Sequence, residues 1–365
     1  MYHLFFYIKM PTIKPKRKVS GLIKILNILL QKHQANIDNI STSSFKIRSF
    51  NKMITIMSSF PGSHVVNVEE IEKHFKDNGV NNPQKMSIIV KEYLKKGSFD
   101  EATDAANHPI IKSVLNLTKI YGIGPKNAKK LYEDHGIITI SDLRKKVKTE
   151  PSIINNKVKI GLKYHTQLEK RIPRIEIDNY KEVIENICTE ISPNLKMSIN
   201  GSYRRGLPTS GDIDILITSD NPTDNPSELR KCLITKLKKK GVIIETLANG
   251  KKKFMGIGKL SSRGFTIARH IDIIDTTFGE FPFAVLYFTG SGGFNTNMRT
   301  EALKQGYSIN EYTISDKNTK IPVNSSKIMA KIGKGIFESE KDIFEFLDME
   351  FVEPGERNTV TLSKI

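Results

Sequence analysis

Two glycine turns and the aliphatic runs beside them restrict the fold of this chain more than any other feature. The first turn is Gly201-Ser-Tyr-Arg-Arg-Gly206, which follows the apolar run Leu195–Ile199, and the second is Gly211-Asp-Ile-Asp214. We predict a buried strand at the apolar run and another that passes through Asp212 and Asp214. Because residues two apart in a strand point to the same side, these two carboxylates are expected to share one face.

Two carboxylates on one face repel each other and raise each other's pKa unless a cation lies between them. Carboxylate oxygens suit Mg²⁺, and two such ions about 4 Å apart can stabilise the attacking and leaving oxygens of a phosphoryl transfer. The first turn supplies donors, because Gly201 permits close approach to a ligand and Ser202 and Arg205 can donate hydrogen bonds to phosphate. The two turns in this order therefore indicate a nucleotidyl-transfer site.

The composition indicates a nucleic-acid-binding protein of more than one domain. The chain has 365 residues and a net charge of +18, which predicts at least two cores and a polyanionic partner. Only Cys188 and Cys232 occur, without a CxxC motif, so we expect a reducing compartment and no structural zinc. We expect no membrane span, because no apolar run approaches the ~20 residues that one needs.

The order of predicted elements indicates an α+β protein. Helical periodicity dominates as far as about residue 116, and strands alternate with helices from about residue 175. The predicted strands of the later part include Asp212–Ile217, Val242–Thr246, Phe254–Gly258 and Ala268–Ile274, with a helix at Ser227–Lys240. The predicted segments are a disordered basic leader at 1–20, a domain of about four helices at 21–105, a helix-hairpin-helix subdomain at 106–175, a mixed-sheet core at 176–280 and a C-terminal α/β subdomain at 281–365.

A third glycine turn, Gly122-Ile-Gly124-Pro125, opens a predicted helix. Successive backbone N–H groups at such a helix start can hold an anion, and Lys126 and Lys129 add positive charge. This pattern predicts a helix-hairpin-helix that binds DNA phosphates without reading the base sequence.

These motifs together resemble the family X DNA polymerases, and within that family DNA polymerase beta. The resemblance covers about residues 20–358. The matching stretches are Tyr121–Pro125, Gly161–Tyr164, Glu169–Arg174, Gly201–Gly206, Gly211–Asp214, Lys253–Gly256, Arg269–Asp272, Leu286–Ser291, Asn310–Thr313 and Ser339–Phe344. It implies a multidomain α+β fold: an N-terminal lyase-like domain that binds the gap, the helix-hairpin-helix, a catalytic palm at 176–280 and a nucleotide-selection subdomain at 281–365.

The resemblance also implies the roles of individual residues. A third carboxylate, Asp272, would complete the catalytic set with Asp212 and Asp214, which would bind two Mg²⁺ ions, with Mn²⁺ as an alternative. The implied nucleotide contacts are Ser202, Arg205, Gly211, Tyr287, Phe288, Gly290 and Asn295. The implied DNA contacts are Gly122, Gly124, Lys126, Lys129, Arg299, Lys253, Lys46, Lys52 and Lys85. The carbonyls of Thr118, Ile120 and Ile123 would hold a monovalent cation, Na⁺ or K⁺.

Several residues depart from the pattern of the family. Where the family has two arginines, an acid and a lysine, this chain has His270, Ile274, Gly292 and Thr296, respectively. We therefore do not expect the fidelity and the closing dynamics of the family to carry over unchanged. Ile89 stands at the place of the lysine nucleophile of the deoxyribose-phosphate lyase. Binding of a 5′-phosphate is expected to survive, whereas lyase activity is expected to be lost or moved to Lys85, with Lys91 as an alternative.

The expected function is template-directed filling of short gaps in DNA repair. Its expected partners are gapped or nicked double-stranded DNA, deoxynucleoside triphosphates and a DNA ligase, and we expect a monomer.

A template-independent terminal transferase is the first alternative function, although the stretch Leu247–Lys253 is short for the loop that such enzymes carry. A non-catalytic gap-binding scaffold is the second. The abundance of Lys, Asn and Ile suggests an A+T-rich genome, and the lysine richness and the divergent lyase region suit a large DNA virus such as an insect poxvirus. That origin would place the protein in the host cytoplasm, and a cellular origin would place it in the nucleus.

Overall fold

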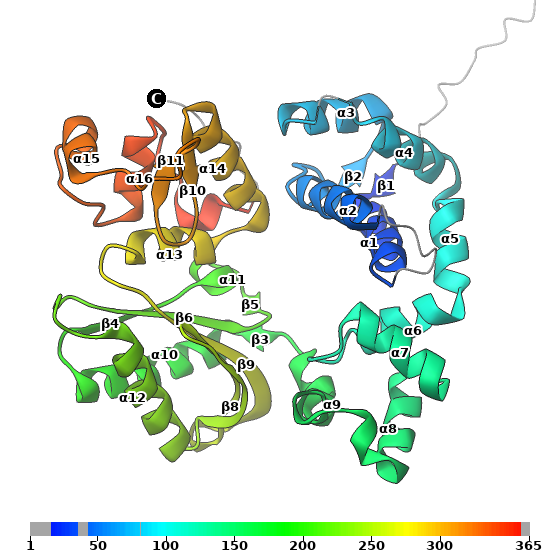
Figure 1. Cartoon of the computed structure of the whole chain (residues 1–365), viewed down its shortest axis with the longest axis horizontal. Coiled ribbons are helices and arrows are strands. Elements are labelled where there is room, and N and C mark those ends of the chain that lie inside the picture. Colours follow the sequence, from blue (N-terminus) through cyan, green and yellow to red (C-terminus); the bar gives the residue numbers. More distant parts are fainter. Residues whose placement is uncertain (1–15, 36–42, 81, 359–365) are drawn as a thin grey trace, which may run out of the picture. The chain divides into compact units, whose positions relative to one another are not determined.

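The computed structural model describes residues 16–35, 43–80 and 82–358 (Figure 1). The chain divides into two compact units, one ending at Ile111 and the other beginning at Lys112. Each unit has its own hydrophobic core, and each is described by itself below. Among the described residues, no helix is both long enough and apolar enough to cross a membrane.

The N-terminal unit is a small helical domain. Its elements are β1 (Arg17–Lys18), α1 (Val19–Gln34), α2 (Ser43–Ser58), β2 (His64–Val65), α3 (Val68–Asp77), α4 (Gln84–Lys96) and α5 (Asp100–Asn107), and α6 (Pro109–Leu117) crosses the boundary. The helices form because their apolar residues recur every three or four positions. Leu22, Leu26 and Leu29 of α1 are fully buried in this way. Helix α4 ends at Gly97, whose φ of +79° is accessible to glycine at low cost.

The prediction of a disordered leader as far as residue 20 is wrong at its end. Arg17 pairs with Val65 in a short antiparallel ladder, and α1 begins at Val19, which is buried. The backbone pairing and this apolar anchor explain the order of these residues. The rest of the predicted leader, residues 1–15, lies outside the described part of the chain.

The second unit opens with a helical region that includes the predicted hairpin. It contains α7 (Pro125–His135), α8 (Ile140–Thr149), η1 (Pro151–Ile153) and α9 (Asn156–Leu168). The turn between α6 and α7 needs glycine at Gly122, where φ is +94° and a Cβ would lie 3.2 Å from side-chain atoms of Lys157 and Val158. Gly124 is the N-cap of α7 and Pro125 its first residue, a position where the missing N–H of proline costs nothing.

A five-stranded sheet with the order β4-β6-β9-β8-β7 forms the centre of the second unit (Figure 1). Its elements are β4 (Leu195–Ile199), β6 (Ile213–Ser219), β7 (Ile243–Asn249), β8 (Lys253–Leu260) and β9 (Phe265–Asp275), with α10 (Arg174–Ile191), α11 (Gly201–Arg204) and α12 (Pro226–Lys239). Short strands β3 (Ile172–Pro173) and β5 (Thr209–Ser210) pair beside it. Strands β6 and β9 are parallel and the other neighbours antiparallel, so the predicted mixed sheet is confirmed.

Different helices pack against the two faces of the sheet. Ile215 and Ile273 belong to a core that includes residues of α10 and α12. Leu216 and Ile274, which alternate with them along β6 and β9, pack instead against α13 (Phe281–Thr289). Side chains alternate along strands, so Asp214 and Asp272 lie on the α13 side, away from α10 and α12.

The strand ends differ from the predicted bounds by at most three residues. Strand β6 begins at Ile213 instead of Asp212, because Gly211 and Asp212 form the bend before it. Strand β7 continues to Asn249, three residues beyond the predicted end, since Asn249 still pairs with Phe254. Pairing partners in the sheet, which local periodicity does not reveal, set these ends.

The C-terminal subdomain follows α13 and has its own core of aromatic and aliphatic residues. Its elements are α14 (Gly292–Lys304), β10 (Tyr307–Ile309), β11 (Ile314–Asp316), α15 (Ser325–Ile332), α16 (Glu340–Phe346) and η3 (Pro354–Glu356). A capping box between Ser339 and Asp342 starts α16, as the Ser-x-x-Asp spacing favours.

Candidate active site

The first glycine turn is built around a close approach to Asp214. Gly201 has a φ of +60°, and a Cβ on it would lie 2.6 Å from Asp214 Oδ2. The Asn200 N–H also donates to the Asp214 carbonyl at 2.8 Å. Glycine is therefore required here both for its backbone conformation and for the space that the carboxylate occupies.

Three carboxylates gather at this turn. Asp214 pairs with Asp272 in the parallel register of β6 and β9, and Asp212 is exposed in the bend two residues earlier. Burial, followed by the charges of Asp212 and Asp272, raises the pKa of Asp214 to about 7. The site therefore has an excess of negative charge that a cation would relieve.

Asp272 is engaged by two neighbouring basic side chains. Its Oδ2 lies 2.6 Å from Lys253 Nζ, and its Oδ1 lies 3.7 Å from His270 Nδ1. Burial acts to raise the pKa of Asp272, and His270 and Lys253 outweigh it, so this pKa lies below its ordinary value. The buried Oδ1 has no hydrogen-bond partner among the described residues.

The donor set fits a hard divalent cation, although the side chains do not converge on one point. Within the described residues, no three His, Cys, Asp or Glu side chains are arranged so that they could hold a metal ion. The unpartnered Oδ1 of Asp272 and the raised pKa of Asp214 are nevertheless what carboxylate ligands without a cation should show. Metal binding would require Asp272 to exchange Lys253 for the ion.

Metal affinity should fall as the pH is lowered through about 7. Below the pKa of Asp214 a bound proton must leave before the carboxylate can act as a ligand, so the Mn²⁺ affinity should fall about tenfold per pH unit below 7 and level off above it. Titration of Mn²⁺ by electron paramagnetic resonance between about pH 5.5 and 8.5 measures this. An affinity that stays constant over this range would contradict the assignment.

Two arginines of the turn connect it to the end of α13. Arg204 Nη1 donates to Thr289 Oγ1 at 2.7 Å and Arg205 Nη1 to the Thr289 carbonyl at 2.6 Å. Arg205 Nε also donates to Asn358 Oδ1 at 2.8 Å. The predicted phosphate donor Arg205 is therefore satisfied by protein groups here, while Ser202 lies half-buried in the same turn.

A buried carboxylate joins this turn to the C-terminal subdomain. Glu340 of α16 accepts from Arg204 Nη2 and from Arg357 Nη1, each at 2.6 Å. Glu340 and Arg357 are both buried. Arg204, Glu340 and Arg357 were not among the predicted site residues. The stretch Ser339–Phe344 matches the family pattern, but no local signal in it indicates that Glu340 faces a distant turn.

The residues predicted to contact the nucleotide in the C-terminal subdomain lie together. Tyr287 and Phe288 pack edge to face with centroids 5.1 Å apart, and Asn295 Nδ2 donates to the Tyr287 carbonyl at 2.7 Å. The Arg299 guanidinium lies 5.1 Å from the Tyr287 ring centroid. Tyr287, Asn295 and Arg299 line one small cavity, together with Asn310. Two other predicted nucleotide contacts are glycines: Gly290 follows α13 with a φ of +64°, and Gly211 is exposed in the bend before β6.

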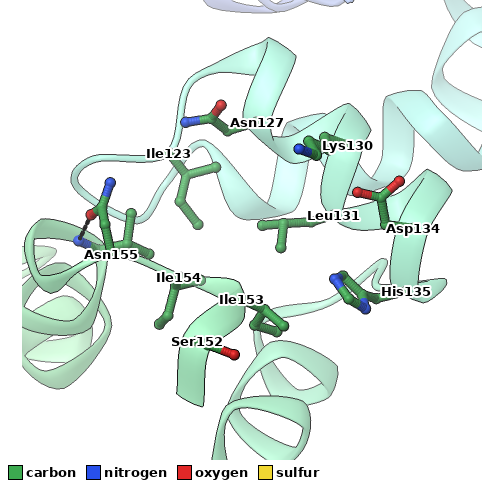
Figure 2. Close-up of a pocket in the computed structure, with 11 residues that line it drawn as sticks. Ile123, Asn127, Lys130, Leu131, Asp134, His135, Ser152, Ile153, Ile154 and Asn155 are labelled. Carbon is green, nitrogen blue, oxygen red and sulfur yellow. Dashed lines mark hydrogen bonds between the residues drawn. The ribbon is translucent and has the colours of Figure 1, made fainter. Parts of the chain in front are cut away.

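A larger cavity of about 420 Å³ lies in the helical region beside the predicted hairpin (Figure 2). Figure 2 shows Lys130, Asp134 and His135 of α7 on one wall and Ser152–Asn155 on the facing wall. Ile123 of the hairpin turn also lines it. The cavity is therefore separate from the three carboxylates.

The predicted functions of the hairpin turn stay predictions. The Ile120 carbonyl accepts the Ile123 N–H at 3.1 Å, and the structure does not test the cation site predicted at Thr118, Ile120 and Ile123. The same holds for the DNA contacts predicted at Gly122, Gly124, Lys126 and Lys129.

In the N-terminal unit the predicted phosphate-binding lysines are on α2 and α4. Lys85 Nζ lies 4.5 Å from the centroid of the Phe50 ring, and His33 stacks on the same ring at 5.4 Å. Burial lowers the pKa values of both His33 and Lys85, and the charge of the half-buried Lys46 lowers them further. Lys52 donates to the Gly79 carbonyl at 3.4 Å. His33 was missed, because a histidine within an apolar helix gives no functional signal.

The mixed sheet, the glycine turn and the adjacent acids define a nucleotidyltransferase palm. Comparison with known families supports this class and refines it. Residues 171–277 match the model of the DNA polymerase beta palm, residues 284–358 that of the DNA polymerase beta thumb, and residues 115–169 that of the fingers domain of DNA polymerase lambda. The chain belongs to the family X DNA polymerases.

Individual relatives agree with these models. DNA polymerase lambda of Rattus norvegicus is 30% identical over 281 residues, which cover 75% of this chain and 46% of the relative. DNA polymerase lambda of Arabidopsis thaliana is 26% identical over 322 residues (85% and 57%), and DNA-directed DNA/RNA polymerase mu of Homo sapiens is 23% identical over 371 residues (93% and 69%). The chain thus spans about half the length of the two lambda relatives.

Proposed function

We propose that this protein is a template-directed DNA polymerase that fills short gaps in double-stranded DNA. The observation that carries the proposal is the parallel register that sets Asp214 beside Asp272, next to a glycine turn shaped around the Asp214 carboxylate. Members of family X use divalent metal ions and bind gapped DNA and deoxynucleoside triphosphates. The net charge of +18 favours the same polyanionic partner.

The proposed reaction is a single displacement at phosphorus. The primer 3′-hydroxyl oxygen forms a bond to the α-phosphorus, the bond from this phosphorus to the bridging oxygen of pyrophosphate breaks, and Asp272 accepts the hydroxyl proton. Asp212, Asp214 and Asp272 would hold two Mg²⁺ ions, or Mn²⁺ in their place. Bound divalent ions supply Lewis-acid stabilisation of charge on the phosphate oxygens. Ser202, Arg205 and Gly211 would bind the triphosphate.

The remaining predicted residues orient the two substrates in this proposal. Tyr287, Phe288 and Gly290 line the sugar, Asn295 contacts the incoming base, and Arg299 and Lys253 contact DNA. The lysines of the hairpin hold the phosphate backbone without reading bases, with Na⁺ or K⁺ at its carbonyls. The turn between β7 and β8 has only three residues, which favours template-directed synthesis over a terminal transferase.

Gap filling tests the proposal directly. A duplex with a one-nucleotide gap, a labelled primer and a 5′-phosphate should be extended by the nucleotide that the template specifies, in the presence of Mg²⁺ and all four deoxynucleotides. A labelled single strand serves as the control for template-independent addition. Failure to extend the gapped duplex, or equal extension of the single strand, would refute the proposed function.

The side chains around Phe50 in the N-terminal unit favour a second activity, that of a deoxyribose-phosphate lyase. His33 Nε2 is buried without a hydrogen-bond partner among the described residues, and Lys85 lies across the same Phe50 ring. Burial, and then the charges of Lys46 and Lys32, lower the pKa of Lys85, while Glu101 opposes them. A lysine whose pKa is lowered beside other cations is a candidate for imine formation. We propose that Lys85 attacks the C1′ aldehyde of a 5′-deoxyribose phosphate.

Borohydride trapping tests this second activity. The Lys85 amine would add to the aldehyde and lose water to give an imine, which hydride from borohydride reduces to a stable amine. Lys85→Ala should lower the trapped adduct about tenfold or more, while Lys91→Ala, at another exposed lysine of α4, should not. Absence of an adduct with the unaltered protein would remove the lyase and leave a domain that only binds the 5′-phosphate, and an adduct that persists in Lys85→Ala would show that Lys85 is not the nucleophile.

A further inference from the structure

The turn between β7 and β8 is held in place by a buried arginine. Arg230 of α12 donates from Nη2 to the carbonyls of Gly250 and Lys251, both at 2.9 Å, and its Nε pairs with Asp275 at the end of β9. Arg230 and Asp275 are only 2% and 3% exposed. A buried network whose members satisfy one another is rigid, so the turn presents the next residue, Lys252, from a fixed backbone.

The Lys252 side chain connects this turn to two other segments. Its Nζ lies 2.7 and 2.8 Å from the two carboxylate oxygens of Glu280, just before α13, and 5.2 Å from the centroid of the Tyr312 ring. Glu280 also accepts the Thr277 N–H at 3.0 Å. A cation that is already oriented by a carboxylate can attract an aromatic face. Lys252 therefore joins the palm to the subdomain that carries Tyr312.

Tyr312 lies at the tip of the β10–β11 hairpin, which is also rigid within itself. The Asn310 Oδ1 accepts the backbone N–H groups of Tyr312 and Thr313, both at 2.9 Å, and the Asn310 N–H donates to the Thr313 carbonyl at 3.1 Å. Because the tip moves as one piece, the position of Tyr312 also determines that of Asn310. Asn310 lines the small cavity that contains Tyr287, Asn295 and Arg299.

The backbone of Lys252 faces the catalytic strand. Its carbonyl accepts the Asp275 N–H at 3.2 Å, and the following residue, Lys253, pairs with Asp272. We propose that Lys252 is a positioning residue, which holds the Asn310–Thr313 hairpin tip at the nucleotide-facing cavity through the Tyr312 ring. This inference rests on the proposed polymerase function and identifies a residue that adjusts nucleotide affinity in it.

Single-nucleotide gap-filling kinetics test the proposal. Lys252→Met keeps the aliphatic stem and removes the charge, and should raise KM for the templated nucleotide roughly two- to fivefold, with kcat within about twofold. Tyr312→Leu should have the same effect, whereas Tyr312→Phe keeps the aromatic face and should preserve KM. The double variant Lys252→Met/Tyr312→Leu should be no worse than either single variant. Lys251→Met, at an exposed neighbouring lysine, is the matched control.

Hydrogen exchange provides a readout that does not depend on activity. Amides of residues 307–316 should exchange faster in Lys252→Met than in Lys251→Met. Unchanged exchange together with an unchanged KM would overturn the positioning role, as would additive effects of the two substitutions. If the unaltered protein fills no gap but the exchange difference is present, the polymerase proposal fails while the contact between Lys252 and Tyr312 stands.

Discussion

Replacement of Asp214 by asparagine should abolish nucleotide incorporation while DNA binding persists. Asparagine has nearly the same shape, so it keeps the packing beside Gly201 and removes only the negative charge. Loss of a ligand to catalytic metal ions removes several kcal/mol of transition-state stabilisation, which corresponds to a decrease in kcat of about a thousandfold or more. Single-turnover gap filling measures the rate, and fluorescence anisotropy with the same gapped duplex measures binding.

Asp220→Asn is the matched control for this substitution. Asp220 follows the same strand, is exposed, and pairs with Lys196 at 3.2 Å, so it should retain the rate of the unaltered protein. Incorporation that persists in Asp214→Asn at more than about a tenth of the original rate would show that this carboxylate is not a catalytic metal ligand. A loss of DNA binding in parallel with activity would instead indicate damage to the fold.

Replacement of Glu340 by alanine should cause the largest loss of stability among the substitutions considered. Glu340 is 6% exposed and accepts from Arg357, which is fully buried, and from Arg204. Removal of the carboxylate would leave the Arg357 guanidinium buried without its ionic partner, which typically costs about 3–5 kcal/mol. Urea unfolding followed by circular dichroism measures the change in the free energy of unfolding.

The nearby Glu338→Ala separates this effect from the loss of any surface charge. Glu338 is 55% exposed and pairs with Lys334 at 3.1 Å, so its removal should change the free energy of unfolding by no more than about 1 kcal/mol. A similarly small change in Glu340→Ala would mean that water or neighbouring groups can replace the carboxylate. The contacts of Glu340 with Arg204 and Arg357 would then contribute little to the free energy of unfolding.

The proximity of Asp214 to the first glycine turn was predictable because these residues are close in sequence. Side chains alternate between the faces of a strand, so the sequence predicts that Asp212 and Asp214 share one face, whereas in the structure only Asp214 lies in β6 and Asp212 lies in the bend before it. The glycine at position 201 was expected to permit a close approach, and the space it leaves is filled by Asp214. The mixed sheet was predictable for a similar reason, because aliphatic runs of strand length mark strands buried in a sheet.

The contacts of these residues could not be predicted in the same way. Lys253 was expected to contact DNA, whereas its ammonium pairs with Asp272 in this structure, because β8 and β9 are neighbours in the sheet. Glu340 lies more than a hundred residues from Arg204, and its ionisable side chain would ordinarily be assigned to the surface of α16. Only the packing of the C-terminal subdomain on the turn determines that it is buried.

The sequence by itself therefore determined the class of fold and predicted a polyanionic partner and an acidic centre, because these inferences follow from composition, periodicity and spacing over a few residues. Tertiary structure decided which acid has a raised pKa and which a lowered one, which arginines are satisfied by the protein, and which lysine reaches Tyr312. Burial and charge neighbours arise from segments far apart along the chain. Their effects on pKa and position depend on distances that only the folded chain defines.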